Sequence, residues 1–183
     1  MSRRLMQKDD VVAVALDFQE KLVPAMRDSR VLEATVAKLM TGLKILRVPI
    51  LVTQQYTKGL GATTETISQA IGDFDHIEKT TFSAMREEAF VNALQETGAR
   101  TVLLLGLETH ICVEQTAMEL LDAGYKVVLV TDCCSSRKKH DKRVAVERMM
   151  SAGVDVTTYE AALFELLGGS REEGFKEISR LVK

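Results

Sequence analysis

Three side chains that together could carry out acyl transfer each lie at or just after the end of a predicted strand. Asp17 follows the first such strand, Lys79 ends the third, and Cys112 comes shortly after the fourth. In open α/β sheets, ligands bind beyond the carboxyl ends of the strands, at the point where the strand order reverses. If the first and fourth strands are neighbours at that reversal, Asp17 and Cys112 face one crevice and Lys79 must reach in from the other side.

The chemistry of such a group follows from the residue types. Cys112 begins a predicted helix, where unpaired backbone N–H groups and the helix dipole favour an anion, so we expect its thiol pKa to fall. The Lys79 ammonium would act in the same direction. The Asp17 carboxylate could take the thiol proton and later return it to a leaving amine. Backbone N–H groups around Cys112 could hold a developing oxyanion. These roles together describe acyl transfer from an amide-like substrate.

Each of the three residues also has a simpler interpretation. A lone cysteine at a helix start is more often a small buried residue than a nucleophile. An aspartate after a strand is usually a turn or cap residue, and Lys79 beside Glu78 could be a solvated strand end. Taken singly, none of them carries a functional conclusion.

The elements that must position these residues are short, apolar, β-branched runs separated by helical patterns. The predicted strands are Val11–Leu16, Pro49–Thr53, His76–Lys79, Thr101–Leu105, Lys126–Thr131 and Val154–Thr158. Near-continuous apolar strands are required for a parallel sheet that is covered on both faces. Gly98, Gly124 and Gly153 each close a helical window before a strand, as left-handed helix-ending residues do. We therefore predict a three-layer α/β/α fold whose six-stranded parallel sheet has the order 3-2-1-4-5-6.

Length and composition limit the other possibilities. The 183 residues fit one domain, which we place at 1–183, and the formal net charge of −2 argues against a nucleic-acid partner. No apolar run reaches the roughly 20 residues of a membrane helix. The three cysteines are expected to be reduced thiols in a cytoplasmic protein, and only Arg3 and Arg4 leave import into an organelle open.

Three segments resemble the motifs of the isochorismatase-like cysteine hydrolases. Gly106–Ala117 (GLETHICVEQTA) resembles the nucleophile motif of that superfamily. Val14–Leu22 (VALDFQEKL) resembles its first strand with the catalytic aspartate, and Glu78–Ser83 (EKTTFS) resembles the segment with the catalytic lysine. The order and spacing agree over nearly the whole chain. Within the superfamily, the sequence is most similar to the isochorismatase domain-containing proteins.

The resemblance implies a role for each matching residue. Cys112 would be the nucleophile, Asp17 the general base and Lys79 the cation that polarises the site. The resemblance also implies a cis peptide bond between Leu107 and Glu108, with the backbone N–H groups of Glu108 and Cys112 forming the oxyanion hole. Assembly into a homo-oligomer is a further expectation that rests on the resemblance.

The sequence departs from two branches of the superfamily. Nicotinamidases carry an Asp-x-His metal motif after the second strand, whereas this chain has Gln54, Gln55, Tyr56 and Thr57 there. Because a catalytic zinc needs about three protein ligands, we expect no metal, no cofactor and no nicotinamidase activity. Isochorismatases that cleave a vinyl ether lack the nucleophilic cysteine, so Cys112 argues against that reaction as well.

Several other residues are predicted to border the crevice. Expected contacts with a small-molecule substrate are Phe18, Gln19, Gln54, Phe82 and Ile111, although each could equally have a core or surface role. Asp132, Ser135, Ser136 and Arg137 are expected to form a turn and cap after the fifth strand. The basic run Arg137, Lys138, Lys139, Lys142 and Arg143 reads as a solvated helix face, because it has no aromatic neighbours.

The function that these observations favour is a metal-free cysteine hydrolase. It would act on a small amide, ureido or related acyl compound through a covalent thioester. The alternative is a catalytically silent binding or scaffold protein with the same fold. A nucleotide-binding protein has no support, because neither glycine-rich phosphate motif occurs.

Overall fold

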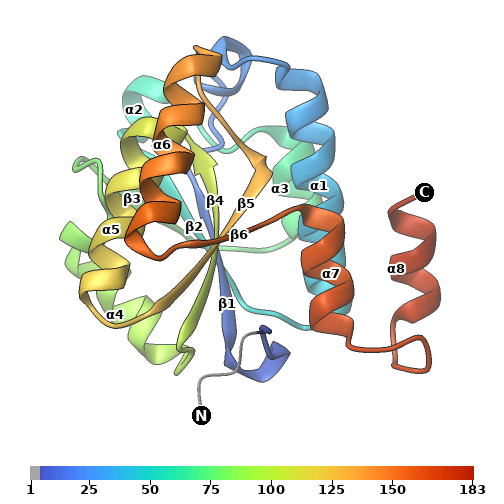
Figure 1. The fold of residues 1–183 in the computed structure, drawn as a ribbon. Coiled ribbons are helices and arrows are strands. Elements are labelled where there is room, and N and C mark those ends of the chain that lie inside the picture. Colours follow the sequence, from blue (N-terminus) through green and yellow to red (C-terminus); the bar gives the residue numbers. More distant parts are fainter. Residues whose placement is uncertain (1–4) are drawn as a thin grey trace.

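A computed structural model describes residues 5–183, so Arg3 and Arg4 lie outside the described residues. Its centre is a six-stranded, all-parallel sheet in the order β3-β2-β1-β4-β5-β6 (Figure 1). The strands are β1 (Val11–Leu16), β2 (Ile50–Gln55), β3 (His76–Lys79), β4 (Thr101–Leu107), β5 (Lys126–Ser135) and β6 (Asp155–Thr157). The predicted strand order is confirmed, and β1 and β4 are neighbours at the reversal.

Helices cover both faces of this sheet and form the predicted three layers. The helices are α1 (Ser29–Ile45), α2 (Thr57–Leu60), α3 (Glu65–Ile71), α4 (Glu88–Glu96), α5 (Glu114–Asp122), α6 (Lys139–Ala152), α7 (Tyr159–Leu167) and α8 (Phe175–Leu181). Helices α4, α5 and α6 lie on one side, and α1, α3 and α7 lie on the other, with α8 packed outside α1 and α7 (Figure 1).

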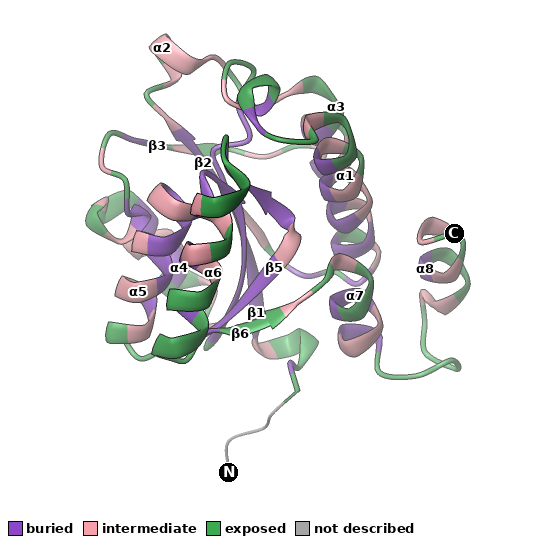
Figure 2. Ribbon diagram, turned by 45° about the horizontal axis from the view of Figure 1, so that its top comes forward, coloured by how far each residue is buried: buried purple, intermediate pink, exposed green. Residues whose placement is uncertain are grey.

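Burial of the strands explains their composition. Every residue of β1 (VVAVAL) and β4 (TVLLLGL) is buried, because these central strands have helices on both faces. The short edge strand β6 is mostly exposed. Figure 2 shows this contrast, with buried strands inside and exposed helix surfaces outside. The site residues that end β1 and β4 are therefore attached to the best-packed part of the molecule.

The carboxyl end of β5 differs from the prediction. Asp132 and Ser135 were expected in a turn, but the strand continues through both residues. A register shift between Leu104 and Gly106 of β4 lets Gly106 pair with Cys134 and Leu107 pair with Ser135. Aspartate and serine are poor strand formers, so long-range pairing with β4 overrides their local preference here. Strand β2 also extends further than predicted and includes Gln54 and Gln55.

Gly106 is the position where β1 and β4 approach most tightly. Its φ is +153°, and an added Cβ would lie 2.5 Å from the Cβ of Leu16 and 2.7 Å from its carbonyl oxygen. Leu16 immediately precedes Asp17, so this close approach brings the ends of the two central strands together.

Gly106→Ala should lower the free energy of unfolding by about 3 kcal/mol, because the methyl group must displace backbone atoms of β1. Gly124→Ala is the matched control, since Gly124 also has a positive φ (+88°) but has no atom within 4 Å of the added Cβ. The control should lose only about 1 kcal/mol in urea unfolding. Equal losses in the two variants would contradict this account of Gly106.

Candidate active site

Asp17 leaves β1 with a left-handed backbone conformation, at φ +59°. Its N–H donates to the carbonyl of Thr53 at 3.2 Å, which continues the β1–β2 pairing by one residue. Aspartate adopts this conformation more readily than most residues, and such conformations gather at functional sites. The bend turns the Asp17 side chain inward, where it is fully buried.

The Asp17 carboxylate is bound at both oxygens. Thr53 Oγ1 donates to Oδ1 at 2.7 Å, and Lys79 Nζ lies 2.8 Å from Oδ2. Neither the Asp17 nor the Lys79 side chain is exposed. Buried charges persist in proteins when they are paired and hydrogen-bonded. The opposite charges of Asp17 and Lys79 therefore compensate each other inside the protein.

The Lys79 ammonium is the centre of the cluster. Lys79 ends β3, and its Nζ donates to Gln55 Oε1 and to the carbonyls of Thr81 and Phe82, both at 3.2 Å. The same Nζ lies 3.4 Å from Cys112 Sγ. The three residues predicted to act together are thus placed together, from the ends of β1 and β3 and from the segment after β4.

Cys112 lies in a single π-helical turn, Thr109–Val113, between β4 and α5. Such turns occur frequently at functional sites. The peptide bond between Leu107 and Glu108, just before the turn, is cis. Cys112 is buried, with 7% of the residue exposed.

Two backbone N–H groups near the thiol could hold an oxyanion. The N–H groups of Ile111 and Val113 donate to the Glu108 carbonyl at 3.0 and 3.3 Å, whereas the intervening Cys112 N–H does not. The Glu108 N–H has no acceptor among the described residues. An unpaired N–H at a reaction site can donate to charge that develops on a substrate oxygen.

The thiol pKa differs from the prediction. Burial, and after it the neighbouring Asp17 carboxylate, raise the pKa of the Cys112 thiol to about 12. Lys79 lowers it, but does not outweigh those two effects. The expectation of a lowered pKa was wrong because it counted the nearby cation and neglected burial and the carboxylate. At neutral pH the site therefore holds a protonated thiol beside a carboxylate.

The residues predicted to contact substrate fall into two groups. Phe18, Gln19 and Gln54 are buried, and the Gln19 amide donates to the carbonyls of Gln55 and Gly61 and accepts from the Gln55 N–H. This leaves Gln19 holding the end of β2 in place. Phe82, whose carbonyl binds Lys79 Nζ, is 54% exposed, and Ile111, which precedes Cys112, is partly exposed.

Three residues of the site were not anticipated in these roles. Thr53 binds the Asp17 carboxylate, Gln55 binds the Lys79 ammonium, and Arg137 pairs with the Glu108 carboxylate, with its Nε 3.0 Å from Oε2. The run Thr53–Gln55 did carry a signal, because three polar residues end an otherwise apolar strand. The Arg137 pairing had none, since it joins segments far apart in the sequence.

The other two cysteines and the possible metal ligands within residues 5–183 also bear on the chemistry of the chain. Cys133 and Cys134 are buried, and burial raises the pKa of both thiols, that of Cys134 to about 12. No group of three histidine, cysteine, aspartate or glutamate side chains in residues 5–183 could hold a metal ion. Within the same range, no helix is both long and apolar enough to span a lipid bilayer.

Comparisons with known proteins place these features in one family. The isochorismatase domain profile matches residues 11–161. Isochorismatase domain-containing protein 1 of Salmo salar is 38% identical over 167 residues, covering 91% of this chain; the chain spans only 59% of that relative. A Caenorhabditis elegans structure described as MAR1 ribonuclease matches with a TM-score of 0.91 at 34% identity. The match covers 97% of this chain and 92% of the C. elegans chain. Escherichia coli YcaC, described as an octameric hydrolase of unknown specificity, matches with a TM-score of 0.88 at 24% identity, covering 93% and 86%.

The hydrogen bond from Thr53 to Asp17 can be tested by an isosteric change. Thr53→Val removes one partner of a buried carboxylate, so the free energy of unfolding should fall by about 1–3 kcal/mol. Thr101→Val is the control, because Thr101 is a buried strand threonine for which no side-chain hydrogen bond is found in residues 5–183. It should lose less than about 1 kcal/mol. If Thr53→Val loses no more unfolding free energy than Thr101→Val, the hydrogen bond from Thr53 to Asp17 contributes little to stability.

The effect of Asp17 on the thiol predicts a change with pH. Asp17→Asn removes a charge that raises the pKa of Cys112, so the pKa should fall and more thiolate should exist at any pH below it. At pH 8, alkylation of Cys112 by iodoacetamide should become roughly tenfold faster, because the thiolate is the reacting form. Peptide mapping separates Cys112 from the other thiols.

Asp132→Asn serves as the matched control for this measurement. Asp132 is half-buried and does not contribute to the Cys112 pKa. Its variant should alkylate at the wild-type rate. Slower or unchanged alkylation of Asp17→Asn would refute the stated cause of the raised pKa.

Proposed function

The chain belongs to the isochorismatase family, and on that premise we propose that it is a cysteine hydrolase that works without a metal. Its substrate would be a small amide, ureido or related acyl compound. The observation that carries the proposal is the position of Lys79 Nζ, 2.8 Å from the Asp17 carboxylate and 3.4 Å from Cys112 Sγ. A buried carboxylate, ammonium and thiol in contact supply a base, a cation and a nucleophile at one point.

In the first half of the proposed reaction, Asp17 takes the proton of the Cys112 thiol while Sγ bonds to the substrate carbonyl carbon. The carbonyl electron pair moves onto oxygen, and the N–H groups of Glu108 and Cys112 donate to that oxyanion. When the oxyanion collapses, the C–N bond breaks and Asp17 returns its proton to the leaving nitrogen. The products are a thioester on Cys112 and a free amine or ammonia.

In the second half, water replaces the amine. Asp17 takes a proton from the water as its oxygen attacks the thioester carbonyl, and the same two N–H groups hold the second oxyanion. Collapse breaks the C–S bond, and the thiolate recovers the proton from Asp17. The acid leaves and the starting site is restored.

A thiol that starts protonated suits this sequence. Since burial and Asp17 hold the pKa of Cys112 at about 12, the thiolate forms only as the base takes the proton and the new bond develops. The Lys79 ammonium compensates the charge as it moves between the carboxylate and the sulfur. Lys79 is held for this role by the carbonyls of Thr81 and Phe82 and by Gln55.

Substrate would approach from the side of Cys112 where side chains are exposed. We propose that Phe82 and Ile111 contact it directly, while Phe18, Gln19 and Gln54 support the crevice from within. We further propose that the protein acts in the cytoplasm, where free thiols persist, and as a homo-oligomer. Exposed apolar side chains such as Met150 and Val156 favour self-association.

A catalytically silent protein of the same fold is the alternative, and RNA cleavage is a further one because of the C. elegans neighbour. A screen of small amides and ureido compounds, read by release of ammonia or amine, distinguishes them. Wild-type protein should turn over at least one compound, and Cys112→Ala should lose about a thousandfold or more of that activity while remaining folded.

Cys134→Ala is the matched control in the screen, because Cys134 is another buried thiol and contacts none of the triad in the interactions found. It should keep most of the activity. A labelled RNA substrate in the same assay should remain intact. Turnover by Cys112→Ala, or RNA cleavage in place of amide hydrolysis, would overturn the proposal.

A further inference from the structure

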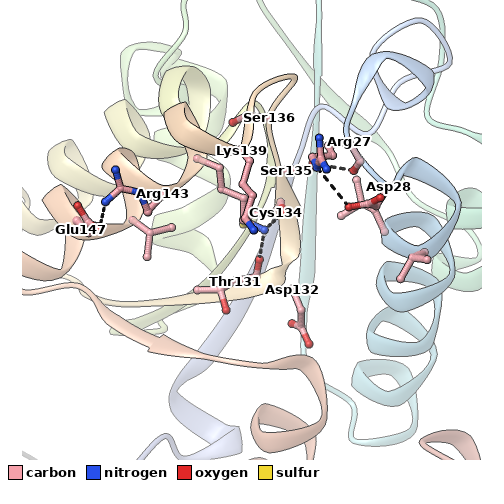
Figure 3. Close-up of a pocket in the computed structure, with 14 residues that line it drawn as sticks. Arg27, Asp28, Thr131, Asp132, Cys134, Ser135, Ser136, Lys139, Arg143 and Glu147 are labelled. Atoms are coloured by element: carbon pink, nitrogen blue, oxygen red, sulfur yellow. Dashed lines mark hydrogen bonds and ion pairs between the residues drawn. The ribbon is translucent and has the colours of Figure 1, made fainter.

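A cavity of about 760 Å³ lies beyond the carboxyl half of β5, and none of the Asp17, Lys79 and Cys112 side chains lines it. The start of α1 forms one wall and α6 forms the other, as Figure 3 shows with Arg27 and Asp28 facing Lys139 and Arg143. This volume is typical of a site for a small molecule. Beyond Val130, no strand within residues 5–183 pairs with β5 on its β6 side, so the cavity takes the place of a strand.

The floor of the cavity is rigid. Cys134, Ser135 and Ser136 are all buried and belong to β5 or follow it directly. Ser135 Oγ donates to the carbonyl of Arg27 at 3.2 Å, and Ser136 Oγ lies 2.9 Å from His110 Nδ1. These contacts fix the floor to the loop before α1 and to the turn that carries Cys112.

Lys142 is the residue of the cavity whose contacts favour a bound ligand. Its Nζ donates to the carbonyls of Thr131 and Cys134 at 2.8 and 2.7 Å, which holds the ammonium at the cavity wall. No ion pair of the described residues includes Lys142, so no carboxylate touches the ammonium there, and Asp132 acts on it only at longer range. A partly buried ammonium that is fixed in place and has no carboxylate in contact favours the binding of an anion.

The other charged side chains of the cavity do not form an ion pair with Lys142. Asp28 pairs with Arg27 and Glu147 pairs with Arg143, so these four charges compensate one another. The Asp132 carboxylate points away from Lys139 in Figure 3 and accepts the N–H of Tyr159 at 2.9 Å. Burial raises its pKa and outweighs the opposite effect of Lys142, so Asp132 compensates the Lys142 charge only in part. Lys139, like Lys142, lines the cavity without an ion pair among the described residues.

The wall from α1 and α6 adds apolar surface. Val31, Leu32 and Val146 line the cavity beside the two lysines. We propose that the cavity binds a small organic anion, with its phosphate or carboxylate group at Lys142 and Lys139 and its apolar part against these three side chains. This site is separate from the catalytic proposal, and binding can be measured without any turnover.

Isothermal titration with phenyl phosphate and with benzoate tests the inference, with benzyl alcohol as the uncharged probe. At least one anion should bind with one-to-one stoichiometry, and the alcohol should bind about tenfold or more weakly. The two anions separate a phosphate preference from a carboxylate preference. In amide NMR spectra, the bound anion should shift the signals of Cys134, Ser136 and Val31.

Substitutions that change the charge of single lysines test whether the anion binds in this cavity. Lys142→Met and Lys139→Glu should each weaken anion binding about tenfold or more, and Lys139→Glu keeps the test valid if Lys142→Met fails to fold. Lys138→Glu is the matched control, because Lys138 is the exposed neighbour of Lys139 and does not line the cavity. It should change the affinity by less than about threefold, the effect of a distant screened charge.

Several results would overturn the inference. These are no binding of either anion at millimolar concentration, equal affinity for the alcohol, and equal effects of Lys138→Glu and Lys139→Glu. Occupation of the cavity by a second copy of the chain would also overturn it. That occupant would appear as cavity amide shifts that depend on protein concentration without added anion.

Discussion

The buried pairing of Asp17 with Lys79 is the constraint on which the rest of the site depends. Removing two charges from water costs several kcal/mol for each ion, so each of these side chains requires the other. Asp17 follows β1 and Lys79 ends β3. From the intervening β2, Thr53 binds Asp17 and Gln55 binds Lys79. Three strands are therefore held together at their carboxyl ends by the same few polar atoms.

The same pairing affects the protonation state of the Cys112 thiol. Cys112 reaches the pair from the fourth strand, at the point where β1 and β4 touch through Leu16 and Gly106. Because Asp17 and burial together outweigh Lys79, the structure favours a protonated thiol over a thiolate. In the proposed reaction, the proton would therefore leave the Cys112 thiol for Asp17 only as the sulfur bonds to an acyl carbon.

Most of the fold was predictable because its signals are local. The apolar runs of β1 and β4 are typical of central parallel strands, and their ends fixed the places of Asp17 and Cys112. The extension of β5 through Asp132 was not predictable, since it depends on a register shift in β4. Local propensity pointed to a turn at that position, and pairing across the sheet prevailed.

The candidate site also has a part that the sequence predicts and a part that it does not. That Asp17, Lys79 and Cys112 lie together could be predicted from their positions at strand ends and from motif resemblance. Their supporting contacts could not, because the Thr53 bond and the Arg137–Glu108 pair join separate segments. The solvated helix face predicted for the basic run was only partly right, since Lys142 turns to the carbonyls of β5 and lines a cavity. Burial explains the failure of the pKa prediction, and burial is a property of the whole fold.

The central claim is that Cys112 forms a covalent acyl intermediate. The most direct test uses an acyl compound that the protein turns over. The reaction is stopped with acid during turnover, and the protein is then examined by intact-mass analysis and peptide mapping. The account predicts a mass increase equal to the acyl group, on the peptide that contains Cys112 and on no other cysteine peptide. Turnover without any adduct on Cys112, or with the adduct on Cys133 or Cys134, would contradict it.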